Sequence, residues 1–215
     1  MLVLALDTSS AAVSAALVEV SDDRVEAVAA HQTINVRGHG EYLAPMIAAC
    51  LRDANSAPTD LHAIVAGTGP GPFTGLRVGL VTAAVMAETL GIPAYGVCSL
   101  DGIAVPGSAL LVATDARRRE VYWATYRDGR VHGPHVSRPA DVPLEGSEAM
   151  AGAGARLYAE VFGLPLVGAD YPSTIALADQ ARERIVTRAA ADALTPLYLR
   201  RPDAVEPGAA KRVSQ

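Results

Sequence analysis

The sequence predicts an α/β protein with two lobes. Short apolar runs typical of strands alternate with longer amphipathic segments typical of helices. One junction is especially clear: the apolar run His62–Ala66 leads through a glycine- and proline-rich loop into a helix that begins at Phe73 or Thr74. The turn-forming residues Pro106–Ser108 then divide the chain into a longer N-terminal part and a shorter C-terminal part.

Composition sets limits on the class of protein. The chain has 215 residues, 50% of them hydrophobic, which is enough for one large or two small lobes. Its net charge of −5 argues against a protein that coats nucleic acid broadly. Cys50 and Cys98 lie in apolar surroundings, and we expect reduced core thiols in a cytoplasmic protein. Arg77 and Glu88 interrupt the longest apolar run, so we expect no membrane span.

The chain is expected to open with three strands. They cover Leu2–Leu6, Ala11–Val20 and Arg24–Asn35, and the first two form a hairpin with the tip Asp7–Ser10. This opening resembles the actin, hexokinase and Hsp70-type ATPase fold, in which the aspartate orients metal-bound water and the tip surrounds phosphate. The alternative is that Asp7 and its hydroxyl neighbours only satisfy backbone groups of the turn.

Two helices in the N-terminal part are predicted to dock a partner. The first covers His39–Asn55 and carries apolar residues on one side; the second has small residues every four positions, which permits close approach of another helix. We assign to this partner interface Tyr42, Leu43, Met46, Ile47, Cys50, Gly75, Gly79, Ala83 and Met86. The alternative is that both helices simply cover the sheet.

The glycine loop before the second helix lacks the standard phosphate-binding signatures. No Gly-Lys-Ser/Thr sequence follows the glycines, and Pro72 stands where the third glycine of the dinucleotide fingerprint belongs. We therefore expect the loop to position the helix.

The C-terminal part is predicted to begin with another strand hairpin. After a strand at Ala94–Cys98 and a short helix at Ser99–Val105, strands at Ala109–Thr114 and Val121–Tyr126 flank the tip Asp115–Glu120. This tip carries three consecutive arginines, which are candidate contacts to RNA phosphates or to acidic groups of a partner: Arg117, Arg118 and Arg119. The alternative is a solvated hairpin tip.

The remaining segments are less regular. We expect residues 128–168 to be rich in loops apart from a helical stretch at Arg156–Phe162, and a longer helix to run from Thr174 to about Ala191. The expected division is an N-terminal lobe of residues 1–105 with 192–203 packed back on it, a C-terminal lobe of 106–191, and a frayed tail of 204–215.

Catalytic and metal-binding patterns are scarce. The five histidines include no His-x-x-x-His pair, and His132 and His135 lie in a glycine- and proline-containing segment without acidic or cysteine companions. There is also no Gly-x-Ser-x-Gly elbow of a serine hydrolase. We therefore assign no catalytic, cofactor-binding or metal-binding residue.

Five segments together resemble the TsaB (YeaZ) family, in the family's own order and along the whole chain. They are Leu4–Ser9, Gly69–Gly79, Cys98–Leu100, Asp115–Tyr122 and Pro196–Arg200. The glycine loop combined with the arginine-bearing hairpin is specific, whereas the Asp-Thr-Ser motif alone is weak. Pro72 departs from the family, in which serine is common at that position, while the loop length is intact.

The resemblance implies a two-lobed actin/hexokinase/Hsp70-like (ASKHA) fold, with mixed sheets flanked by helices. It implies a non-catalytic scaffold or activator subunit in the synthesis of N6-threonylcarbamoyladenosine in tRNAs that read codons beginning with A. The implied partners are the paralogue TsaD, which performs the transfer, and the ATPase TsaE, with a homodimer in isolation and tRNA contacted only through the complex. ATP or ADP and a divalent metal are expected on the partner subunits, with no cofactor bound tightly by this chain.

Two other functions compete with this expectation. One is a stand-alone enzyme, either an ASKHA-type ATPase or an M22-like peptidase, although the residues do not support the peptidase label. The other is an RNA-binding module, which depends on the arginines of the second hairpin tip.

Overall fold

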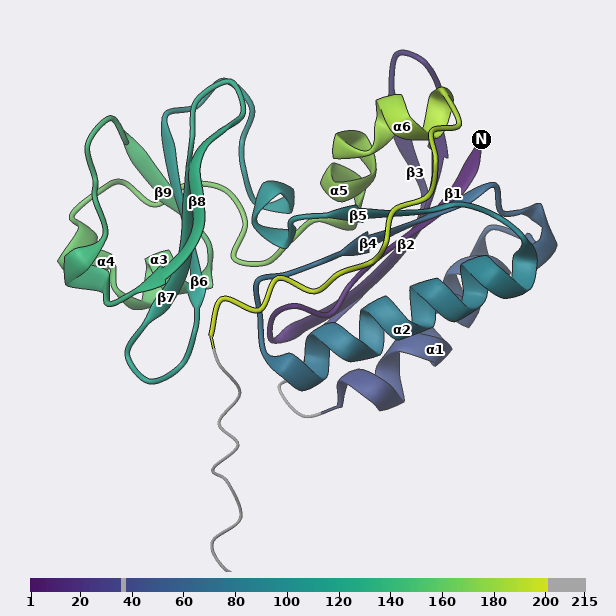
Figure 1. Ribbon diagram of the computed structural model, residues 1–215, viewed down its shortest axis with the longest axis horizontal. Coiled ribbons are helices and arrows are strands. Elements are labelled where there is room, and N and C mark those ends of the chain that lie inside the picture. The colour runs from purple at the N-terminus through teal and green to yellow at the C-terminus, as the bar shows by residue number, and fades with distance from the viewer. Residues whose placement is uncertain (36–37, 201–215) are drawn as a thin grey trace, which may run out of the picture.

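The computed structural model describes residues 1–35 and 38–200, which form two sheets with helices on their faces (Figure 1). The larger sheet has the strand order β3-β2-β1-β4-β5. Its strands are β1 (Leu2–Asp7), β2 (Ala12–Val20), β3 (Val25–Ile34), β4 (Ala63–Gly67) and β5 (Ala94–Val97). The first three are antiparallel neighbours, and β4 pairs in parallel with both β1 and β5. The three predicted opening strands are confirmed.

Two long helices make the crossovers that these parallel strands require. Helix α1 (His39–Asp53) connects β3 to β4, and helix α2 (Phe73–Leu90) connects β4 to β5. They lie side by side on one face of the sheet (Figure 1). Their buried side chains form one apolar core with β1, β2 and β4. Helix α2 ends at Gly91, whose left-handed φ of 66° closes the last turn.

The opposite face of the larger sheet is covered by two short helices from near the C-terminus. They are α5 (Thr174–Gln180) and α6 (Arg182–Val186), which pack their apolar side chains on Val3, Val65 and Tyr95. The sequence suggested one helix from Thr174 to about Ala191, and it placed that segment in a lobe of residues 106–191. In the structure the helix is broken at Ala181 and belongs to the core of the first sheet.

The smaller sheet has the strand order β8-β7-β6-β9. Its strands are β6 (Leu110–Asp115), β7 (Val121–Tyr126), β8 (Arg130–Ser137) and β9 (Ala149–Ala151), and the helices α3 (Ala153–Leu157) and α4 (Ala159–Phe162) cover one face. Three 3₁₀ turns, η1 (Pro58–Asp60), η2 (Ser99–Gly102) and η3 (Pro139–Asp141), complete the described elements.

Three local expectations differ from the structure. Residues 128–168, expected to be mostly loops, contain the strands β8 and β9. A Gly-Pro pair inside β8 hid that strand in the sequence. Proline is tolerated there because β8 is an edge strand, whose outer amides need no partner. The helical stretch expected at Arg156–Phe162 is the pair α3 and α4, and the helix expected at Ser99–Val105 is only the 3₁₀ turn η2.

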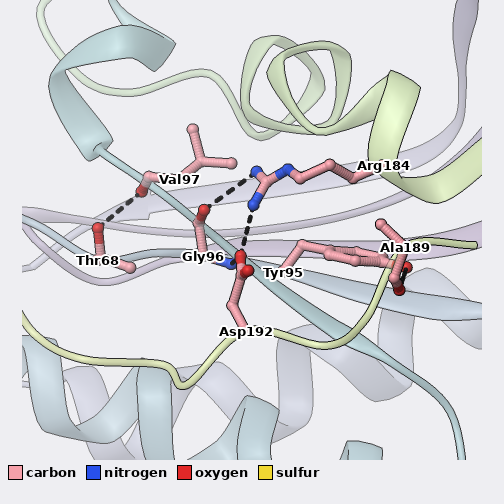
Figure 2. A network of polar contacts seen from close by, with 7 residues as sticks. All are labelled: Thr68, Tyr95, Gly96, Val97, Arg184, Ala189 and Asp192. Atoms are coloured by element: carbon pink, nitrogen blue, oxygen red, sulfur yellow. Dashed lines mark hydrogen bonds and ion pairs between the residues drawn. The ribbon is translucent and has the colours of Figure 1, made fainter.

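After α6 the chain returns as an extended strap along the edge strand β5 (Figure 1). The amide of Asp192 donates to the Ala94 carbonyl at 2.9 Å, and the amide of Leu197 donates to the Thr68 carbonyl at 2.9 Å. Side chains complete the attachment (Figure 2): the Asp192 carboxylate accepts the Gly96 amide at 2.9 Å and pairs with Arg184, which also donates to the Gly96 carbonyl at 3.1 Å. The tail expected at 204–215 lies outside the described residues.

Helix α2 is long and apolar enough, by length and composition alone, to cross a membrane. We had expected Arg77 and Glu88 to exclude a span, and by this test they do not. The same test is passed by core helices of soluble proteins. Here 33% of the helix is buried in the fold, by packing on β1 and β4. Several other residues of the helix are exposed, among them Val81 and Val85, and their apolar side chains therefore need another explanation.

Candidate functional site

Asp7 ends β1 at the tip of the first hairpin and is fully buried. Its Oδ1 accepts the Ser9 amide at 2.9 Å and the Ser9 hydroxyl at 2.8 Å, and its Oδ2 accepts the Ser99 hydroxyl at 2.5 Å. Burial raises the pKa of this carboxyl, and the hydrogen bonds from Ser99 and Ser9 oppose that rise. A β-carbon at Gly67 would overlap the carboxylate. Both oxygens are thus engaged by the protein itself, which favours the structural interpretation of Asp7 over the metal-orienting one.

The neighbouring residue Thr8 explains the small residues of helix α2. Its hydroxyl donates to the Gly75 carbonyl at 2.7 Å and accepts the Gly79 amide at 3.1 Å, so it bridges one turn of the helix. A β-carbon at Gly75 would overlap the Thr8 carbonyl oxygen, and one at Gly79 would overlap the Thr8 hydroxyl. The glycines therefore bring the helix close to the first hairpin of its own chain.

Most residues of the predicted partner interface are buried within their own chain. Seven of its residues face the sheet of their own chain, because the apolar side of each helix is also the side that must cover β1, β2 and β4. These buried residues are Leu43, Met46, Ile47, Cys50, Gly75, Gly79 and Ala83. Met86 is partly buried against the same core, and only Tyr42, with 39% of its surface exposed, faces outward.

The outer faces of the two helices carry a different apolar surface, which the sequence analysis missed. On α2, Val81 and Val85 are 58% and 57% exposed, and Ala84 between them is exposed. On α1, the exposed residues include Ala44, Pro45 and Ala48. We call these six residues the outer helix face. The charged residues of both helices lie toward the helix ends, and none of them belongs to this face: Glu41, Arg52, Asp53, Arg77 and Glu88.

The predicted arginines lie at the tip between β6 and β7. Arg117 pairs with the Asp115 carboxylate at 3.3 Å, and Arg117 and Arg119 are exposed. This tip borders a cavity of about 430 Å³ between the two sheets, whose other walls include Ser9, His39 and Thr74. The structure therefore brings the second hairpin tip opposite the first one.

The cysteines and His135 are packed within the fold. Cys50 and Cys98 are buried free thiols, as predicted, and burial raises the pKa of Cys98 to about 11. His135 packs against Trp123 with ring centroids 5.1 Å apart. Within residues 1–35 and 38–200, no three His, Cys, Asp or Glu side chains are grouped in a way that could hold a metal ion.

Comparison with known proteins places these features in a family context. The family model described as TsaD, tRNA N6-adenosine threonylcarbamoyltransferase, matches residues 27–167. A protein of Mycobacterium tuberculosis described as uncharacterised is 48% identical over 206 residues, which cover 94% of this chain and 93% of that protein. The tRNA threonylcarbamoyladenosine biosynthesis protein TsaB of Escherichia coli is 36% identical over 142 residues, which cover 62% of this chain and 59% of TsaB.

Solved structures agree with the sequence matches. YeaZ from Pseudomonas aeruginosa superimposes with a TM-score of 0.75 at 28% identity, covering 92% of this chain and 99% of that chain. The two-sheet arrangement is thus the actin-like, ASKHA-type fold of YeaZ, as predicted. Relatives differ in length: this chain spans only 56% of an uncharacterised protein of Mycobacterium leprae to which it is 46% identical.

Proposed function

The chain belongs to the TsaD family, on its TsaB (YeaZ) branch, and from this membership we propose that it acts in tRNA threonylcarbamoyladenosine synthesis as a non-catalytic partner subunit. Its partner in this proposal is the paralogue TsaD, joined by the ATPase TsaE. ATP or ADP and a divalent metal belong to the partner subunits, tRNA is modified by the complex, and the complex works in the cytoplasm.

The observation that carries the partner role is the outer helix face. It combines exposed valines and alanines in the middle of two neighbouring helices with charged residues at their ends. An apolar centre within a polar rim is the anatomy of a protein interface, and small side chains let a partner helix approach closely. Because TsaD is a paralogue, the corresponding helix pair of TsaD is the natural occupant. A second copy of this chain takes its place in a homodimer when TsaD is absent.

The non-catalytic part of the proposal is supported by Asp7. In ATPases of this fold class we expect the corresponding aspartate to orient metal-bound water. Here Ser9 and Ser99 supply the hydrogen bonds to both carboxylate oxygens, and Gly67 packs directly against them. A carboxylate engaged in this way holds the first hairpin, the end of β4 and the η2 turn together, and a metal or water would have to displace those contacts.

The test is the double variant Val81→Asp, Val85→Asp in the full chain. We expect its affinity for TsaD, measured by calorimetry, to fall at least about 30-fold, because two carboxylates would have to be desolvated at the centre of the interface. Sedimentation should show the same variant as a monomer at concentrations where the unmodified chain self-associates. Formation of the modified nucleoside in the reconstituted system should fall in parallel.

The matched control is Val161→Asp on helix α4, where the valine is 50% exposed and far from the outer helix face in the fold. It should leave both association equilibria unchanged. If the double variant folds, as judged by circular dichroism, and still binds TsaD with the original affinity, the outer helix face is not the interface.

A further inference from the structure

An exposed aromatic pair lies where helix α2 begins beside the C-terminal strap. Phe73 and Tyr198 stack with ring centroids 5.0 Å apart and planes inclined by 27°. Each residue nevertheless remains 41% exposed. Aromatic rings carry a large apolar surface, so an exposed stacked pair at the surface is a candidate contact for a flat ligand.

Arg77 holds this pair in place. Its guanidinium carbon lies 4.2 Å from the centroid of the Phe73 ring, and its Nε donates to the Tyr198 hydroxyl at 3.3 Å. These contacts fix both rings before any ligand arrives. A ring that is already immobilised loses little conformational entropy on binding, which raises the affinity that stacking can supply.

The arginine tip lies next to the rings. A cavity of about 210 Å³ is lined by Phe73 and Tyr198 and also by Arg117 and Arg118. Four arginines of the described residues line this cavity or contact its rings, although the chain as a whole has a net charge of −5: Arg77, Arg117, Arg118 and Arg200. Two of them are paired with carboxylates, Arg117 with Asp115 and Arg200 with Glu120.

The tip and the rings belong to one rigid frame. Arg200, two residues after Tyr198, donates to the Ala116 carbonyl at 2.8 Å and pairs with Glu120. The tip backbone is unusual, because Arg117, Arg118 and Arg119 all have left-handed φ values, of 62°, 52° and 62°. Side chains of this size rarely adopt that conformation, and such strain is typically retained at functional sites.

We propose that this surface binds an unpaired nucleotide of single-stranded RNA. The base stacks on the exposed part of the Tyr198 ring, which Phe73 supports from behind, and the neighbouring phosphates pair with Arg117 and Arg118. Planar guanidinium groups match phosphate oxygens in pairs, and aromatic rings accept the face of any base. An acidic protein segment would satisfy the arginines but would offer no flat group to the rings. A duplex is excluded from stacking because its bases already cover one another.

This inference deepens the proposed function, on which the identification of the RNA as tRNA rests. It also modifies the expectation that tRNA is contacted only through the complex, because this chain would supply one contact of its own. The contact is sequence-tolerant and weak by itself, and it would add to those made by the partner subunits.

The test uses the full chain and a fluorescently labelled, unstructured oligoribonucleotide of about ten nucleotides, with binding followed by anisotropy at low salt. Tyr198→Leu should weaken binding about 5- to 100-fold, because it removes a stacking surface. Tyr198→Phe keeps the ring and should retain most of the affinity. Arg118→Gln should lower the slope of log K against log salt concentration by about 0.7, the value for one phosphate contact on a single strand.

Matched controls lie elsewhere on the surface. Arg24→Gln removes an exposed arginine near β3, and Val161→Ala removes exposed apolar surface on α4. Both should leave RNA binding unchanged. The same RNA annealed to its complement should bind more weakly, and its affinity should be insensitive to Tyr198→Leu.

Three results would overturn the inference. They are unchanged RNA affinity in folded Tyr198→Leu, equal affinity for single strand and duplex, and loss of TsaD binding in Tyr198→Leu without loss of RNA binding, which would make this surface a protein interface. Each is measured without the Val81→Asp, Val85→Asp variant, so failure of the RNA contact and failure of the partner interface are separate outcomes.

Discussion

At the scale of single residues, Thr8 determines how helix α2 sits on the protein. Its hydroxyl donates a hydrogen bond to the Gly75 carbonyl and accepts one from the Gly79 amide. Glycine in a helix interior costs about 0.5–1 kcal/mol relative to alanine, and here the two hydrogen bonds and the close approach offset that cost. The close approach of helix α2 to the first hairpin thus requires that Gly75 and Gly79 carry no β-carbon.

We predict that Gly79→Ala destabilises the protein by about 1–3 kcal/mol, since the new β-carbon would displace the Thr8 hydroxyl. The measurement is the free energy of unfolding in urea. Gly40→Ala is the matched control, because a β-carbon at Gly40 of helix α1 meets nothing within 4 Å. It should be neutral or stabilise by up to about 1 kcal/mol. Equal destabilisation by both changes would contradict the role assigned to Thr8.

The same residues show the limit of pattern analysis for the site. The four-residue spacing of Gly75, Gly79 and Ala83 correctly identified one close-packed side of a helix. Spacing does not say which neighbour packs there, and that neighbour proved to be the chain's own hairpin. Val81 and Val85 carried no pattern of their own, because an exposed valine differs from a buried one only in the tertiary structure.

At the scale of elements, the C-terminal strap protects an edge of the larger sheet. The backbone groups of Gly96 on the outer strand β5 are satisfied by the side chains of Asp192 and Arg184, and the neighbouring Tyr95 hydroxyl donates to the Ala189 carbonyl at 2.9 Å (Figure 2). Unpaired strand edges promote association between chains, so covering this edge favours a discrete monomer surface.

We predict that Asp192→Ala destabilises the protein by about 1 kcal/mol, because the Gly96 amide and Arg184 lose their shared acceptor. The figure is modest because both charged side chains are about one third exposed, at 35% and 36%. Hydrogen exchange at the Gly96 amide should accelerate more than at amides of β1. Glu26→Ala, which breaks the exposed pair with Arg24, is the control and should change neither quantity; a matching effect there would point to general charge loss.

Elements also differed in how well the sequence predicted them. Strands β1 and β2 and helix α1 fall within one or two residues of their predicted bounds, and α2 begins where the sequence predicted, since each has a regular hydrophobic pattern. Strand β8 was missed because Gly133 and Pro134 break its pattern, and β9 because it has only three residues. Short elements are specified by the sheet that receives them and leave little signal in their own residues.

At the scale of the whole molecule, the buried Asp7 links stability to pH. Burial raises the pKa of this carboxyl above its ordinary value of 3.8, so the folded protein holds a proton at pH values where the unfolded chain has released it. The contribution of this group to stability is therefore greatest in acid and declines as the pH rises through the folded-state pKa.

We predict that Asp7→Asn removes this decline. The difference in free energy of unfolding between the variant and the unmodified protein should shift in favour of the variant as the pH rises above about 4, measured by urea titrations at several pH values. Ser99→Ala provides the opposite change, because loss of its hydrogen bond raises the pKa further, and the decline should extend to higher pH. A difference that is constant with pH for Asp7→Asn would show that the carboxyl is not perturbed by folding.

The return of the strap to the first sheet has a consequence for synthesis of the chain on the ribosome. Strand β5 emerges with residues 94–97, whereas the segment that covers its edge begins at Asp192, roughly 90 residues later. At ordinary translation rates this interval lasts about 5–20 seconds. Helices α5 and α6, which close the opposite face, also come late. The first half of the protein therefore waits, with an open strand edge and an open apolar face, for its last residues, and nascent chains are the form most exposed to aggregation or chaperone capture.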